Sequence, residues 1–178
     1  MESTVLLIAA VLLAVMAAIG SSVVRVVPAW HCGVVTRAGR VARSRSSGLA
    51  IVMPGVERID MVPLQPRSID PLAVTALTRD GVEVRLVVSL LWCVVEPTRA
   101  VQEVSDAGAG TAAAVERALR RLVAGVDLQD LLRDRVAVLS RLPVIALPLL
   151  SPLGVELVDV DLLDAEVRVS PELLRLLA

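Results

Sequence analysis

The first two dozen residues limit what this chain can fold into more than any other feature. From Ser3 to Val24 the sequence carries no charge and consists almost entirely of Leu, Ile, Val, Ala and Met. As a helix this run spans roughly 33 Å, which is enough to cross the ~30 Å hydrocarbon core of a bilayer. Because each Leu, Ile or Val favours insertion by about 0.3–0.6 kcal/mol, the run predicts a transmembrane helix.

The alternative for this run is a cleaved signal peptide, since Ala18 and Gly20 offer small residues to a signal peptidase. However, no Lys or Arg precedes the run, and it is longer than the apolar region of a typical signal. We therefore expect a retained anchor over residues 1–24. Several arginines follow the run and none precedes it, which predicts a single-pass protein of the cell membrane with a cytoplasmic C-terminal domain.

The residues after the anchor, about 150 of them, are enough for one domain with its own core. The net charge is −1, so no overall field attracts nucleic acid. Aromatic residues make up 1% of the chain, and the core must be built from Val, Leu, Ile and Ala. Cys32 and Cys93 lie far apart and imply no disulfide framework, which agrees with a reducing cytoplasm.

The stretch from Leu72 to Val95 gives the strongest strand signal. Asp80-Gly81 in its middle is a preferred turn pair, so the stretch predicts a β-hairpin. After the turn, apolar side chains recur at every second position on one face: Val82, Val84, Leu86, Val88, Leu90, Trp92 and Val94. We expect this strand to lie centrally in a sheet. Shorter strands are predicted at residues 32–37, 39–42 and 155–162, the last with Val158, Val160 and Leu162 facing inward.

Three helices are predicted between the hairpin and the last strand, over residues 97–105, 111–124 and 127–142. Pro97 suits a first helical position, and Asp127 suits the cap of the third helix. Three prolines predict irregular structure next: Pro143, Pro148 and Pro152. Strands and helices segregated in this way indicate an α+β domain.

A set of short motifs follows in order along nearly the whole chain. The most specific are Thr78-Arg79-Asp80-Gly81-Val82-Glu83-Val84 and Glu96-Pro97-Thr98-Arg99-Ala100-Val101. The others are Val24-Arg25-Val26-Val27-Pro28, Gly33-Val34-Val35, Gly39-Arg40-Val41, Ser47-Gly48-Leu49, Leu119-Arg120-Arg121-Leu122, Gly154-Val155-Glu156-Leu157 and Ser170-Pro171-Glu172. In this order they resemble the SPFH (band 7) superfamily, and within it the stomatin-like or slipin branch.

The resemblance implies an SPFH domain over residues 25–170, with a mixed or antiparallel sheet and packed helices. It also implies a membrane-tethered scaffold that forms homo-oligomers, organises lipid microdomains and restrains membrane proteases or channels. An NfeD-type protein or a membrane protease is the partner implied for bacterial members. The family usually continues into a long coiled coil, and we expect a short form here, in which residues 171–178 are the truncated start of that helix.

Candidate chemical sites are few. His31 adjoins Cys32, but neighbours on a strand point to opposite faces, which disfavours a catalytic pair and favours an interfacial role near Trp30. The acidic residues Asp159, Asp161, Asp164 and Glu166 lack the spacing of a calcium loop and indicate a solvated strand edge. We expect no catalytic residue, no metal and no cofactor.

Two groups of residues are candidates for binding. Near an anionic leaflet each arginine contributes about 1 kcal/mol, so the arginines after the anchor are either membrane-apposed or part of an ordinary solvated loop. The apolar segment from Gly48 to Val56 is either a core strand or a loop that dips into lipid. The predicted membrane-apposed set is Trp30, Arg37, Arg40, Arg43, Arg45, Leu49, Ile51, Val52 and Met53. The predicted oligomer contact is Arg117, Arg120 and Arg121.

The function that these observations favour is a non-enzymatic, membrane-anchored, self-associating scaffold whose ligands are membrane lipids and other proteins. A membrane-bound hydrolase or protease is one rival, and it needs a nucleophile with a base. A secreted binding domain released by signal cleavage is the other.

Overall fold

The structure is a computed structural model that describes residues 8, 10, 24–104 and 106–168. The predicted anchor therefore lies outside the described residues, apart from Ile8, Ala10 and Val24. Val24 belongs to the first strand and not to the anchor. Residues 171–178 also lie outside. The chain divides into two compact units, residues 1–64 and 65–178, where the sequence suggested one domain after the anchor.

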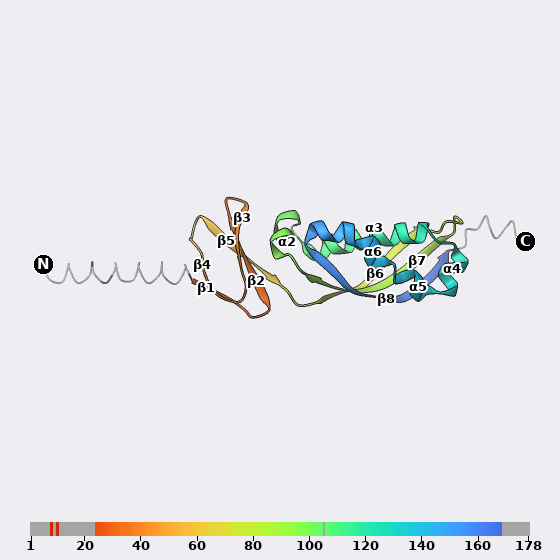
Figure 1. Cartoon of the computed structure of the whole chain (residues 1–178), viewed down its shortest axis with the longest axis horizontal. Helices are drawn as coiled ribbons and strands as arrows, with labels where there is room; N and C mark the ends of the chain where they lie inside the picture. Colours follow the sequence, from red (N-terminus) through yellow and green to blue (C-terminus); the bar gives the residue numbers. More distant parts are fainter. Residues whose placement is uncertain (1–7, 9, 11–23, 105, 169–178) are drawn as a thin grey trace, which may run out of the picture. The chain divides into compact units, whose positions relative to one another are not determined.

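The first unit consists of five short strands: β1 (Val24–Val27), β2 (His31–Arg37), β3 (Arg40–Arg45), β4 (Gly48–Ile51) and β5 (Glu57–Pro63). β1 and β4 form a two-stranded ribbon, and the other three form a sheet in the order β3-β2-β5 (Figure 1). The strands predicted at 32–37 and 39–42 are confirmed as β2 and β3. β3 continues to Arg45, so Arg40, Arg43 and Arg45 stand on a strand and not in a loop.

The ribbon meets the sheet at Gly33 in β2, where side chains from both lie against the glycine backbone. A Cβ atom at this position would lie 2.8 Å from Ile59 Cδ1 and 3.0 Å from Val27 Cγ2. Val27 comes from β1 and is buried together with Val34, Ala50 and Val62. The absence of a side chain at Gly33 thus lets the inner face of the ribbon pack on the sheet.

The second unit has one sheet in the order β6-β7-β8, built from β6 (Arg67–Leu77), β7 (Glu83–Val94) and β8 (Val155–Arg168). The predicted hairpin and the central position of its second strand are confirmed. The strand pairings among the described residues are antiparallel in both units. The alternate residues of β7 from Val84 to Val94 are buried, as the period-two pattern predicted.

Helices cover one face of this sheet (Figure 1). They are α2 (Pro97–Glu103), α3 (Ala107–Ala124), α4 (Leu128–Arg133), α5 (Arg135–Leu139), α6 (Leu142–Leu150) and the 3₁₀ turn η1 (Ser151–Leu153). α3 begins four residues earlier than predicted, because the Asp106 carboxylate accepts hydrogen bonds from the Gly108 and Ala109 N–H groups. The buried residues Val115, Leu119 and Leu122 confirm its inner face.

The prediction of irregular structure around Pro143 and Pro148 is wrong, because residues 142–150 form α6. Pro143 stands in the first turn, where its missing N–H leaves no helical bond unmade. Pro148 lies inside the helix, which nevertheless buries Leu142, Ala146 and Leu150. The stretch Arg135–Leu153 is long and apolar enough to cross a membrane by length and composition, but these buried residues make it part of the folded unit.

β8 is an edge strand among the described strands, and two β-bulges interrupt its pairing with β7. The extra residues are Val158 and Leu163, and both side chains are exposed. The prediction that Val158 faces inward is therefore wrong, because each bulge reverses the alternation. An aspartate follows each bulge and accepts a hydrogen bond from the next backbone N–H. Asp159 accepts from Val160 and Asp164 accepts from Ala165, both at 2.8 Å.

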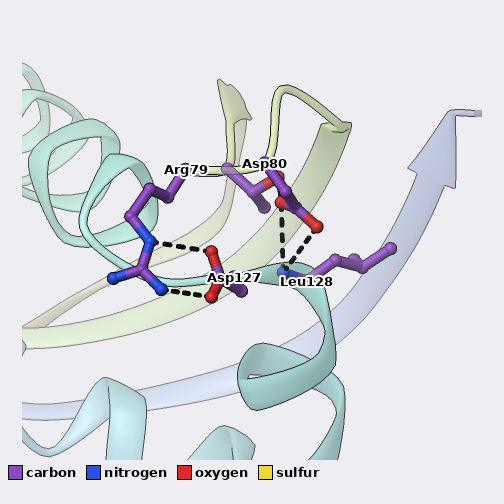
Figure 2. Close-up of polar contacts among 5 residues, drawn as sticks. Arg79, Asp80, Asp127 and Leu128 are labelled. Carbon is purple, nitrogen blue, oxygen red and sulfur yellow. Dashed lines mark hydrogen bonds and ion pairs between the residues drawn. The ribbon is translucent and has the colours of Figure 1, made fainter.

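Polar contacts fasten the β6–β7 turn to the start of α4 (Figure 2). The Arg79 side chain forms a bidentate ion pair with Asp127, in which Nε and Oδ1 are 2.8 Å apart. The Asp80 carboxylate accepts hydrogen bonds from the Leu128 N–H at 3.2 and 3.3 Å. Asp127 occupies the N-cap position as predicted but makes no side-chain capping bond, so the cap of α4 comes from Asp80 in the distant turn.

Candidate membrane-contact surface

The β1–β4 ribbon has two different faces. One is apolar and exposed, and the other packs on the three-stranded sheet of the same unit. The strand register places Val24 opposite Ile51 and Val26 opposite Leu49. These four side chains share a face, which we call the apolar ribbon face, and Val26, Leu49 and Ile51 are 68%, 70% and 65% exposed. The opposite face carries the buried residues Val27 and Ala50. The segment from Gly48 therefore combines both alternatives of the sequence analysis, a strand with one buried and one exposed row.

The exposed row continues past the end of β4. Met53 and Val56 are both more than half exposed and lie in a turn closed by hydrogen bonds from the Val56 and Glu57 N–H groups to the Met53 carbonyl. Val52, which we predicted in the same surface, is 6% exposed and belongs to the core. Its prediction as a membrane-apposed residue is corrected, because side chains on an extended segment alternate between faces.

A buried carboxylate holds this turn in place. The side chain of Glu57 is 5% exposed, and its Oε2 accepts hydrogen bonds from Arg43 Nη2 at 2.9 Å and from the Met53 N–H at 3.0 Å. Arg43 Nη2 also donates to the Ile51 carbonyl at 2.7 Å. Arg43, predicted as a lipid-facing residue, thus makes contacts within the first unit that tie β3 to the end of β4.

The other predicted arginines lie on the β2–β3 hairpin. Arg37 and Arg40 are cross-strand partners that flank the Ala38-Gly39 turn, and Arg45 pairs with Gly33. All three are exposed, so the two like charges at the turn face each other in solvent. Trp30 is also exposed and precedes β2. The hairpin and the ribbon belong to different sheets, so the predicted set comprises two groups rather than one loop.

Neither cysteine has the properties of a nucleophile. Cys32 is buried, and burial raises the pKa of its thiol above the ordinary value. The pKa of the Cys93 thiol is raised by burial and, to a smaller extent, by the charge of Glu156. A raised pKa keeps a thiol protonated and unreactive at neutral pH. Within the described residues, no group of three or more His, Cys, Asp or Glu side chains is arranged to hold a metal ion.

The predicted oligomer contact lies on α3. Arg117, Arg120 and Arg121 lie on the outer side of this helix, and all three side chains are exposed. Arg120 also forms an ion pair with Glu116, four residues earlier on the helix, with Oε1 and Nη2 separated by 2.6 Å.

The sequence alone did not identify Val24, Val26 and Glu57 as parts of the surface. The alternation Val24-Arg25-Val26 was available as a signal, but the preceding apolar run concealed it. Glu57 contacts Arg43, which is 14 positions away, and a single sequence carries no signal for such a pair.

Comparison with known proteins agrees with this fold. The model of the SPFH domain / Band 7 family matches residues 25–172. The chain is 30% identical over 145 residues to an uncharacterised protein of Archaeoglobus fulgidus, with 82% of this chain and 58% of the relative covered. It is 27% identical over 146 residues to stomatin homologues of Pyrococcus horikoshii and Pyrococcus abyssi, covering 82% of this chain and 55% and 54% of these relatives. The chain thus spans little more than half the length of these curated relatives. On the extent of the family match, the chain belongs to the SPFH domain / Band 7 family.

Proposed function

We propose that the protein is a membrane-anchored scaffold whose first unit lies on the bilayer through the apolar ribbon face. The observation that carries the proposal is the register of β1 and β4, which gathers Val24, Val26, Leu49 and Ile51 on one exposed face. A contiguous apolar surface of this kind is typical of a membrane or protein contact. β1 follows the apolar run directly in sequence, so a helix in the bilayer would hold the ribbon close to the lipid.

The free energy of transferring the apolar ribbon face into lipid explains why the scaffold needs the N-terminal run as well as the ribbon. Transferring four partly exposed Val, Leu and Ile side chains into lipid releases on the order of 4–7 kcal/mol. Surface anchors of this strength bind reversibly and need a second signal. The N-terminal run would supply that signal and raise the effective concentration of the ribbon at the surface.

The ribbon contact is tested on the full chain reconstituted in vesicles. An environment-sensitive fluorophore is attached to Leu49→Cys in a Cys93→Ser background, and the control carries it at Leu77→Cys, an exposed leucine of the second unit. We expect a blue-shifted emission and quenching by brominated lipid at position 49 but not at position 77. Equal, water-like emission at both positions would refute the contact.

We further propose that copies associate laterally through the second unit. The outer side of α3 is basic, with Arg117, Arg120 and Arg121, whereas β8 carries the acidic residues Asp159, Asp161, Asp164 and Glu166. Surfaces of opposite charge on one unit suit a head-to-tail contact between identical copies. This arrangement agrees with the role implied by the resemblance to stomatin-like proteins.

Charge reversal on α3 tests this association. Arg117→Glu, Arg120→Glu and Arg121→Glu together should reduce the size of particles extracted in mild detergent, because like charges would then oppose each other. The control is Arg133→Glu, an exposed arginine on α4. If the triple variant keeps the wild-type particle size, α3 is not the contact.

The proposed scaffold is non-enzymatic and needs no cofactor. Its partners are membrane lipids, further copies of the chain, and a membrane protease or an NfeD-type protein, as the family resemblance suggests. The proposed orientation places the C-terminal domain in the cytoplasm of a single-pass cell-membrane protein. Purification from membranes with identification of co-extracted proteins tests the partner.

A further inference from the structure

A groove of about 490 Å³ in the first unit contains two arginines that the predicted surface did not include. Its lining includes Arg25 of β1 and Arg58 of β5, beside the apolar side chains of Val52 and Ile59. A volume of this size is in the usual range for small-ligand sites. The groove therefore has room for a polar headgroup with an apolar wall on one side.

The groove is located behind the apolar ribbon face. Arg25 stands between Val24 and Val26 in β1, so its side chain leaves the ribbon on the side opposite to theirs. Arg58 belongs to β5, which is an edge of the sheet β3-β2-β5. Arg25 and Arg58 thus both line a groove beside this edge strand, on the side of the ribbon away from the surface proposed to contact lipid.

The charges that line the groove favour an anion. Glu57 contributes a carboxylate, but Arg43 and the Met53 N–H already engage it. Within the described part of the chain neither Arg25 nor Arg58 forms an ion pair, and both side chains are exposed. Asp60 is the remaining acidic residue of the lining. Two unengaged guanidinium groups against one carboxylate leave the groove with a net positive charge.

We propose that the groove binds the phosphate group of an anionic phospholipid between Arg25 and Arg58. Guanidinium groups present paired donors that match phosphate oxygens. The apolar ribbon face next to the groove would lie on the acyl region while the phosphate enters from the headgroup layer. This inference rests on the proposed membrane contact and assigns that contact a lipid preference.

The test measures which lipids the full chain retains. The protein is reconstituted in phosphatidylcholine vesicles that contain about one fifth phosphatidylglycerol and is then extracted in mild detergent, and the bound lipid is identified by mass spectrometry. We expect phosphatidylglycerol to be enriched on the wild type by on the order of thirtyfold, which corresponds to about 1 kcal/mol for each of the two arginines at a membrane surface. The Arg25→Gln, Arg58→Gln variant should retain lipids in the bulk ratio.

Two controls separate a defined site from general charge. Arg133→Gln with Arg141→Gln removes the same charge from two exposed positions of the second unit and should leave the enrichment unchanged. Arg25→Lys with Arg58→Lys keeps the charge without the paired donors and should lower the enrichment only in part. Equal losses in the second-unit and groove variants, or no loss in the groove variant, would overturn the site.

Further outcomes distinguish the ligand source and the underlying proposal. Inorganic phosphate that raises the melting temperature of the wild type, with no phosphatidylglycerol enrichment, would make the groove a site for free anions and overturn the lipid assignment. If the fluorophore at position 49 reports lipid contact while enrichment is absent, the phosphate site fails and the membrane contact stands. If both signals are absent, both proposals fail.

Discussion

The carboxylate of Asp80 connects two parts of the second unit that are 48 positions apart in sequence. It accepts a hydrogen bond from the Thr78 hydroxyl within the turn and the N–H of Leu128 at the first turn of α4. The Thr78 hydrogen bond is the main cause that lowers the pKa of Asp80 below its ordinary value, and the Leu128 N–H adds to it. The preceding residue, Arg79, donates its backbone N–H to the Val126 carbonyl and its side chain to Asp127, so consecutive residues fasten the same junction.

Replacing Asp80 with Asn should make the free energy of unfolding less dependent on pH in the acid range. Because the pKa of Asp80 in the folded state lies below its unfolded value of about 3.9, its ionisation favours folding above that pH. This contribution is lost as the pH falls through the folded-state pKa. The difference in free energy of unfolding between wild type and Asp80→Asn should therefore be larger at pH 6 than at pH 2.5, measured by urea unfolding.

An Asp161→Asn variant, which alters an exposed carboxylate on β8, is the control for this comparison. A wild-type to Asp80→Asn difference of the same size at both pH values would contradict the role given to the ionised carboxylate.

At the scale of elements, Gly154 determines how η1, β8 and α2 meet. Its φ angle is +66°, and its carbonyl accepts hydrogen bonds from the Val95 and Glu96 N–H groups, both at 2.9 Å. A Cβ atom at this position would lie 2.4 Å from the Glu96 carbonyl oxygen. Because that neighbour is backbone, relief of the clash requires β8 or the start of α2 to move.

Gly154→Ala should lower the free energy of unfolding by about 2–5 kcal/mol, from a left-handed backbone and a displaced neighbour. Gly81→Ala is a matched control, since its φ is +80° but a Cβ atom there would meet nothing within 4 Å. It should show the backbone contribution alone, about 1–2 kcal/mol. Denaturant unfolding of both variants measures the difference, and equal losses would show that the contact with Glu96 is relieved without cost.

At the scale of the whole molecule, the sequence predicted the elements that follow one regular period. The alternation along β7 and the Asp80-Gly81 turn predicted the central hairpin, and the apolar stripe on α3 predicted its buried side. These features depend on local spacing, which a single sequence contains. The α+β class and the family followed from them and from the ordered motifs.

The features that the sequence did not predict depend on contacts between distant residues. Pro148 stays helical in α6 because that helix packs its other residues in the core. The bulges of β8 become visible only in its register with β7. In the candidate surface, Leu49 and Ile51 were predicted, whereas their partners in β1 and the contact of Arg43 with Glu57 required the paired strands.

The two bulges of β8 affect how this edge of the sheet meets neighbouring molecules. Each bulge is followed by an aspartate that is hydrogen-bonded to the next amide. Proteins confined to a membrane plane meet often, and an open strand margin invites neighbours to fuse into a continuous, irreversible sheet. Along β8 the bulges bend the backbone, and the N–H groups of Val160 and Ala165 are already bonded to aspartate side chains. The carboxylates of these aspartates would also repel the same edge of another copy. The β8 edge is therefore a poor template for a strand of another copy, which limits sheet fusion through this side of the unit.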